Sequence, residues 1–188
     1  MPGTFYLQLN KHRVPKPLDA SHATPRDREI MERALQLAAK AARLGEVPVG
    51  AIVYETDTGR VLGECYNTRE QTRNPLAHAE QLAILEAAQK IGDWRLDSCT
   101  LVVTLEPCAM CAGAIVNSRV GRVVFGAMDP KAGFVGSLGN LLEDDRLNHR
   151  VKAIAGVHSD KSGSLLKQFF ATLREQRAST KRANQRKP

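Results

Sequence analysis

Two short segments, well separated in the chain, carry side chains that bind metals, and the fold must bring them together. The first is His78-Ala79-Glu80 and the second is Pro107-Cys108-Ala109-Met110-Cys111. One His and two Cys can hold a zinc ion and leave its fourth tetrahedral position open for water, as in catalytic zinc sites. Cys108 and Cys111 are three residues apart, so they share a face in the first turn of a helix. The sequence therefore predicts two helix starts facing each other around one Zn²⁺ per chain.

Glu80 is the candidate for moving protons at this site. It lies two residues after His78, and residues at that spacing do not share a face in an ideal helix. We therefore interpret Glu80 as a general acid and base acting beside the metal, not as a ligand. Hydroxide attack on an amino-bearing carbon of a heteroaromatic ring, followed by loss of ammonia, needs such a group. The spacing H-x-E…P-C-x-x-C is the known signature of zinc-dependent nucleobase deaminases.

A C-x-x-C pair alone is more often a structural zinc site or a redox pair. A structural zinc site, however, is usually closed by four protein ligands. Cys65 and Cys99 lie in apolar, strand-like runs and are expected in the core. Four cysteines used in this way indicate a reducing, cytoplasmic chain without a disulfide framework.

The chain is strongly basic, which favours a polyanionic partner, nucleic acid above all. Its formal net charge is +7 over 188 residues, and no apolar run approaches the ~20 residues that span a membrane. A solvated basic surface is the alternative interpretation. Near the end of the chain, basic residues outnumber acidic ones. Between positions 174 and 187 the only acidic residue is Glu175, and the basic residues are Arg174, Arg177, Lys181, Arg182, Arg186 and Lys187.

Hydrophobic periodicity predicts an α/β domain of alternating helices and strands. Thr24-Pro25 is typical of a helix start and Gly45 of a helix end. We expect helices over residues 26–44, 78–90, 107–117 and 161–177, and strands over residues 47–54, 61–66, 99–105, 120–126 and 151–156.

This alternation predicts a five-stranded mixed sheet with helices on both faces. The first two strands are expected to form an antiparallel hairpin. Residues 67–75 are expected to form a polar loop, and the Gly-rich link 127–150 to be functional or partly helical. The predicted organisation is a loose N-terminal arm over residues 1–24, a zinc-dependent deaminase domain over residues 25–177, and a basic, disordered tail over residues 178–188.

At these motifs the chain resembles the cytidine/deoxycytidylate deaminase superfamily and, more narrowly, the bacterial tRNA-specific adenosine deaminases. The resemblance covers about residues 28–174. The H-A-E and P-C-x-x-C motifs identify only the superfamily, whereas V-P-V-G, V-V-F-G-A and N-H-R point to the tRNA branch. The segments that carry it are Glu46–Ala51, Asn74–Glu80, Thr104–Ala114, Ser118–Ala127 and Leu147–Arg150.

The resemblance implies a three-layer α/β/α fold, a homodimer with active sites near the interface, and conversion of adenosine to inosine at the wobble position of a tRNA anticodon. It also implies that Asn67 contacts the target nucleoside. Asp129 and Lys131 match positions near the flipped anticodon nucleotides, and Phe170 and Arg174 match contacts of the last helix to RNA. From the residues alone, Asp129 could equally cap a turn and Phe170 could belong to the core. The N-terminal arm and the basic tail exceed the usual extent of the family.

Two other functions are compatible with the same motifs. The zinc machinery would also serve a deaminase of a free base or nucleotide, such as guanine, cytosine or deoxycytidylate. A non-catalytic RNA-binding or structural zinc protein is a third hypothesis, but such a protein does not need a proton carrier like Glu80. Nothing in the local chemistry chooses adenine over cytosine, and only the resemblance does so.

Overall fold

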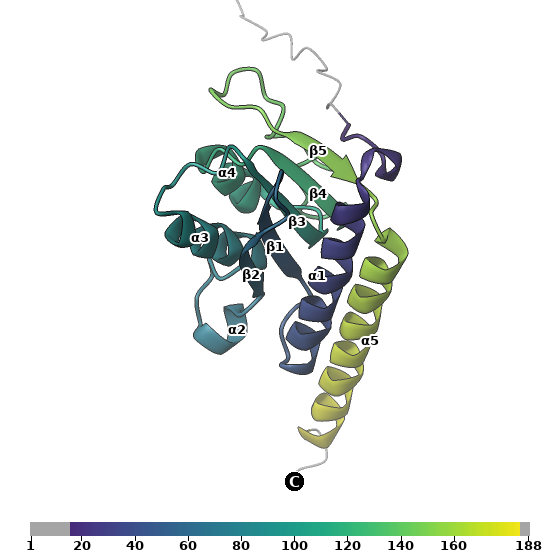
Figure 1. Cartoon of the computed structure of the whole chain (residues 1–188). Coiled ribbons are helices and arrows are strands. Elements are labelled where there is room, and N and C mark those ends of the chain that lie inside the picture. The colour runs from purple at the N-terminus through teal and green to yellow at the C-terminus, as the bar shows by residue number, and fades with distance from the viewer. Residues whose placement is uncertain (1–15, 185–188) are drawn as a thin grey trace, which may run out of the picture.

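The computed structural model describes residues 16–184, which form a five-stranded mixed sheet covered by helices on both faces (Figure 1). The strand order is β2-β1-β3-β4-β5; β1 is antiparallel to β2 and β3, whereas β3, β4 and β5 are parallel. This architecture confirms the predicted fold class. In chain order the elements are η1 (Ala20–His22), α1 (Pro25–Arg43), β1 (Gly50–Glu55), β2 (Val61–Tyr66), α2 (Arg69–Thr72), α3 (Ala79–Ile91), β3 (Cys99–Leu105), α4 (Ala109–Asn117), β4 (Arg122–Ala127), β5 (Lys152–Ala155) and α5 (Ser159–Asn184).

Alternation along the strands divides the interior into two cores. In β1, Ala51 and Val53 face one core, whereas Ile52 and Tyr54 face the other. The first core is closed by α3 and α4, and the second by α1 and α5. Because successive side chains of a strand point to opposite faces, the buried central strands supply both layers at once. The metal-ligand motifs therefore lie on the α3 and α4 side of the sheet.

Helix α1 begins and ends within one residue of the predicted range 26–44. The Thr24 side chain accepts from the Asp27 N–H at 3.1 Å, and the Asp27 carboxylate accepts from the Thr24 N–H at 2.7 Å, so the two residues form a capping box. Pro25 occupies the first helical position, where its missing N–H costs nothing. At the other end Gly45 takes φ +80°, a conformation that glycine adopts without strain.

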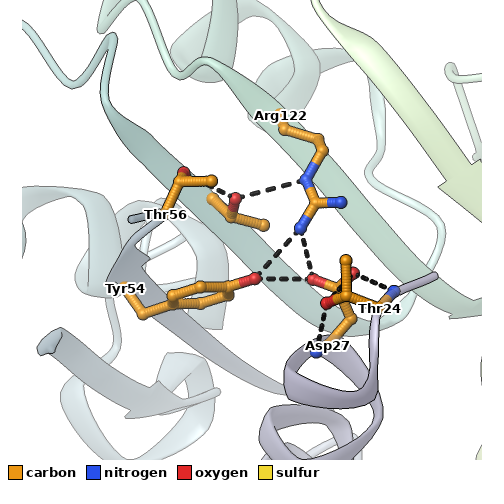
Figure 2. Close-up of polar contacts among 6 residues, drawn as sticks. Thr24, Asp27, Tyr54, Thr56 and Arg122 are labelled. Carbon is orange, nitrogen blue, oxygen red and sulfur yellow. Dashed lines mark hydrogen bonds and ion pairs between the residues drawn. The ribbon is translucent and has the colours of Figure 1, made fainter. Parts of the chain in front are cut away.

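A buried polar network connects the start of α1 to side chains of β1, β3 and β4 (Figure 2). The Asp27 side chain is 0% exposed, and its Oδ1 accepts from Arg122 Nη2 and from the Tyr54 hydroxyl, both at 2.6 Å. Arg122 Nε also donates to Thr100 Oγ1 at 3.3 Å. Burial, together with the hydrogen bond to Asp27, raises the pKa of Tyr54. The network thus satisfies a carboxylate that would otherwise be costly to bury.

The structure corrects several predicted boundaries. Strand β1 begins at Gly50 and not at Val47, because Pro48 has no N–H to donate to a neighbouring strand. The expected polar loop 67–75 contains the short helix α2. Pro107 precedes the first residue of α4, whose N-cap is Cys108, so the proline lies outside the helix.

Both ends of the described chain are more regular than expected. Residues 16–24 of the predicted loose arm pack on the sheet, since the Leu18 N–H donates to the Ala153 carbonyl at 2.9 Å and the Ala155 N–H to Leu18 at 2.7 Å. The edge of β5 thereby gains backbone partners. Helix α5 continues seven residues beyond the predicted end at Arg177, to Asn184, through a run that contains no Gly or Pro to end it. Residues 1–15 and 185–188 of the predicted arm and tail lie outside the described residues.

The link between β4 and β5 was expected to be functional or partly helical, and it contains no helix. Residues 128–151 form turns and isolated bridges. Several of their backbone N–H groups donate to the carboxylate of Glu106 instead of to carbonyls within the link. None of the helices within residues 16–184 combines the length and apolar character needed to cross a membrane.

Candidate metal centre and active site

The three predicted metal ligands meet where two helices begin. His78 is the N-cap of α3, Cys108 is the N-cap of α4, and Cys111 follows in the first turn of α4. The Cys111 Sγ lies 3.5 Å from His78 Nδ1 and the Cys108 Sγ lies 3.9 Å from it. All three ligand atoms lie within 4.8 Å of one another. The structure therefore brings together the three residues that the spacing predicted as one cluster.

The helix starts explain how these side chains converge. Strand β3 ends at Leu105, and Pro107 and the N-cap Cys108 turn the chain directly into α4. The Ala112 N–H donates to the Cys108 carbonyl at 2.8 Å, so the first turn of α4 is closed. Helix N-termini carry a positive potential that favours thiolate over thiol. The Cys-x-x-Cys turn is thus both rigid and suited to anionic sulfur.

The pKa values of the two cysteines are shifted in opposite directions. The pKa of Cys108 is lowered to about 4, because the Cys111 thiol donates a hydrogen bond to the Cys108 sulfur and His78 adds a further favourable contact. The same hydrogen bond raises the pKa of Cys111, and burial raises it further. The pair therefore holds one proton that a divalent cation would displace. Thiolate and imidazole donors are those that zinc prefers, and three of them leave a coordination position open.

Glu80 lies in the first turn of α3 beside this cluster. The residue is 4% exposed, and its Oε2 has no hydrogen-bond partner within the described part of the chain. Burial raises the pKa of this carboxyl above its usual range. An unpaired buried oxygen costs about 1–3 kcal/mol, so most native structures avoid one. A carboxylate kept in this state beside three metal ligands fits a group that meets a metal-bound molecule.

Asn67 anchors the start of α3. It is 7% exposed, and its Oδ1 accepts from the Ala79 N–H at 2.9 Å, one of the donors that the helix itself leaves free. Its own N–H donates to the Val49 carbonyl at 3.1 Å, which connects the entry of β1 to α3. Asn67 therefore lies next to His78 in space, and no side chain within residues 16–184 engages its Nδ2.

The other predicted contacts belong to the link between β4 and β5 and to α5. Asp129 Oδ1 accepts from the N–H groups of Lys131 at 3.0 Å and Ala132 at 3.3 Å, so it does cap a turn, and Lys131 is exposed. Phe170 is 41% exposed and is not a core residue, and Arg174 is exposed as well. Both belong to α5, which runs beside α1 and continues past its end (Figure 1).

Glu106 is a residue whose role sequence reasoning missed. In the sequence it is one residue of the segment Thr104–Ala114, yet in the structure it is 2% exposed and accepts hydrogen bonds from the link that carries Asp129. An acidic residue between a buried strand and a Pro-Cys pair was the available signal. The two predicted core cysteines differ: Cys99 is fully buried, whereas Cys65 is partly buried and donates to Glu86 at 3.4 Å.

Comparison with known proteins gives one consistent family. The family model of MafB19-like deaminases matches residues 26–174. The tRNA-specific adenosine deaminase of Bacillus subtilis (strain 168) is 45% identical over 156 residues, which cover 83% of this chain and 96% of that protein. Its counterpart from Haemophilus influenzae is 43% identical and covers 80% of this chain and 87% of that protein.

Solved structures agree with this result. A tRNA:A34 deaminase that edits A to I at the wobble position superimposes with a TM-score of 0.70 at 36% identity, covering 73% of this chain and 99% of that one. A guanine deaminase from Nitrosomonas europaea gives a TM-score of 0.68 at 26% identity, covering 91% of this chain and 94% of that one. The chain therefore belongs to the MafB19-like deaminase family and to the family of the tRNA-specific adenosine deaminases.

Proposed function

We propose that this protein hydrolyses adenosine to inosine at the wobble position of a tRNA anticodon and releases ammonia. The observation that carries the proposal is the 45% identity to the Bacillus subtilis enzyme across 96% of its length, with the His-Cys-Cys cluster and Glu80 in place. The free-base alternative rests on the guanine deaminase likeness at 26% identity. The higher identity favours the tRNA substrate. The family model supports residues 25–177 as the deaminase domain.

The residues of the cluster divide the chemistry between them. A Zn²⁺ held by His78, Cys108 and Cys111 would supply an acidified water at neutral pH, and we propose one such ion per chain. Glu80 takes a proton from the attacking water and places it on the ring nitrogen beside C6. It then carries the proton of the hydroxyl newly bonded to C6 to the amino group, and the bond between C6 and that nitrogen breaks to release ammonia. Burial raises the pKa of Glu80, which favours the protonated form that it takes between accepting a proton and delivering it.

The target base must leave the anticodon stack to reach this site, which costs least in a single-stranded loop. We propose that Asn67 contacts the flipped nucleoside through its Nδ2, and that Asp129 and Lys131 contact its neighbours. On α5, residues at positions 167, 170, 174 and 177 follow helical spacing and share one face. This face presents Phe170 for stacking and three basic side chains for phosphates: Lys167, Arg174 and Arg177.

We further propose a homodimer formed through the α3 and α4 face. A groove of about 530 Å³ on this face is lined by Leu76, Leu85 and Trp94, each more than half exposed. Contiguous exposed apolar side chains of this kind mark interaction surfaces. Light scattering should show a dimer for the parent and a monomer for Leu85→Glu, whereas Leu138→Glu, in the link, should stay dimeric. A monomeric parent would refute this part.

The tRNA substrate and the free cysteines favour a cytoplasmic location.

The decisive experiment compares substrates side by side. Ammonia release is measured on an anticodon stem-loop with adenosine at the wobble position, on its cytidine-substituted form, on free adenosine and on free guanine. We expect the adenosine stem-loop to react fastest, because remote contacts to the RNA help position the ring. Faster turnover of guanine than of the adenosine stem-loop would discard the tRNA assignment in favour of a free-base deaminase.

A further inference from the structure

The carboxylate of Glu106 is a centre of hydrogen bonds next to the metal-ligand cluster. It lies between the end of β3 and Pro107, two residues before Cys108, and is 2% exposed. Its Oε1 accepts from the N–H groups of Val135 at 3.1 Å and Ser137 at 2.9 Å. Its Oε2 accepts from the Asp129 N–H at 2.8 Å and from the Ser137 hydroxyl. One side chain thus holds three points of the link between β4 and β5.

The link is folded closely around this carboxylate. A Cβ added at Gly133 would lie 2.2 Å from Glu106 Cδ, so only glycine fits beside the acid. Gly133 also forms an isolated antiparallel bridge with Cys108, and the Phe134 N–H donates to the Pro107 carbonyl at 2.8 Å. The link contains no helix or strand of its own. Its position relative to Cys108 therefore depends on Glu106, on these backbone contacts and on the burial of Val135 and Leu142 in the first core.

We propose that Glu106 is a positioning residue for the deamination: it holds the turn of Asp129 and Lys131 in register with the metal ligand Cys108. This inference rests on the proposed function, because the turn is useful only if it contacts the substrate beside the reacting base. An ionised carboxylate can accept on both oxygens, and all four donors require that. An amide in its place must turn an NH₂ group toward at least one backbone N–H, which cannot rotate away.

Glu106→Gln keeps the size of the side chain but replaces one of the two accepting oxygens with an NH₂ donor. We expect kcat per bound zinc on the adenosine stem-loop to fall about 10- to 100-fold, since small misplacements of positioning groups have effects of this order. The affinity for the RNA should change less than about three-fold, because α5 and its basic side chains are untouched. Zinc content should stay at the parental level. Glu143→Gln, an acid in the same link without a hydrogen bond to Glu106, is the matched control and should keep the parental kcat.

Two further variants keep the test decisive if Glu106→Gln folds poorly. Ser137→Ala removes only the hydroxyl donor and should lower kcat a few-fold. Gly133→Ala leaves the carboxylate intact but forces the link away, and should resemble Glu106→Gln. Hydrogen exchange of the Asp129, Val135 and Ser137 amides should accelerate in Glu106→Gln without acceleration in α3 or α4.

The outcomes separate the two proposals. A parent that deaminates no stem-loop would refute the proposed function itself. An active parent whose Glu106→Gln variant keeps kcat within two-fold per bound zinc, or whose link amides exchange at parental rates, would overturn the positioning role. A loss explained entirely by lower zinc content or by global unfolding would also overturn it, because the residue would then act on stability alone.

Discussion

Removing Arg122 should destabilise the fold strongly, because it leaves the buried Asp27 carboxylate without its cation. Asp27 is 0% exposed and Arg122 is 21% exposed, with 2.6 Å between Nη2 and Oδ1. Breaking a buried ion pair from one side typically costs about 3–5 kcal/mol. Three donors remain on the carboxylate in Arg122→Met, namely the Tyr54 hydroxyl and the N–H and hydroxyl of Thr24. We therefore expect the lower end of the range, about 3 kcal/mol.

For a domain of this size, 1 kcal/mol corresponds to about 2–4 °C in Tm, so thermal unfolding followed by circular dichroism should show a drop of roughly 6–12 °C. Arg95→Met is the matched control, since the ion pair of Arg95 with Asp97 is about half exposed on both sides. Such surface pairs contribute about 0–1 kcal/mol. Tyr54→Phe should cost about 1 kcal/mol through one lost hydrogen bond. If Arg122→Met lost no more stability than Arg95→Met, the Asp27 network would not be the anchor of α1.

Three predictions concern the site and its substrate. Glu80→Gln should keep its zinc but lose about 10²–10⁴-fold in kcat, as expected for a general acid and base; deamination within a few-fold of the parent would assign the proton transfer to another group. Cys111→Ser should lose most of the zinc measured by metal analysis, whereas Cys65→Ser should keep it, and the reverse pattern would refute the ligand assignment. Combined Arg174→Gln and Arg177→Gln should weaken stem-loop binding. The slope of log binding constant against log salt concentration should become less steep by about 0.7–0.9 per lost phosphate contact. An unchanged slope would show that these two side chains contact only solvent.

Local signals in the sequence were sufficient for much of the fold. The Thr24-Pro25 pair before α1, the glycine after it and the apolar run of β3 depend on residues close in sequence, and each predicted its element correctly. The same holds for the convergence of His78, Cys108 and Cys111 into one cluster, because each lies at or next to a helix start that short spacings predict. These features are set by backbone geometry within a few residues, which a sequence records directly.

Other features were decided only by contacts between distant residues. Glu106 binds N–H groups 23 to 31 positions away, and Leu18 pairs with β5, so neither leaves a periodic pattern that sequence reasoning can detect. That Glu80 Oε2 has no hydrogen-bond partner within residues 16–184 is likewise a result of burial in the folded chain. Spacing alone therefore determined which groups can do the chemistry. Tertiary packing determined how the link is held beside them, because hydrogen bonds across such separations exist only once the sheet and its helices have formed.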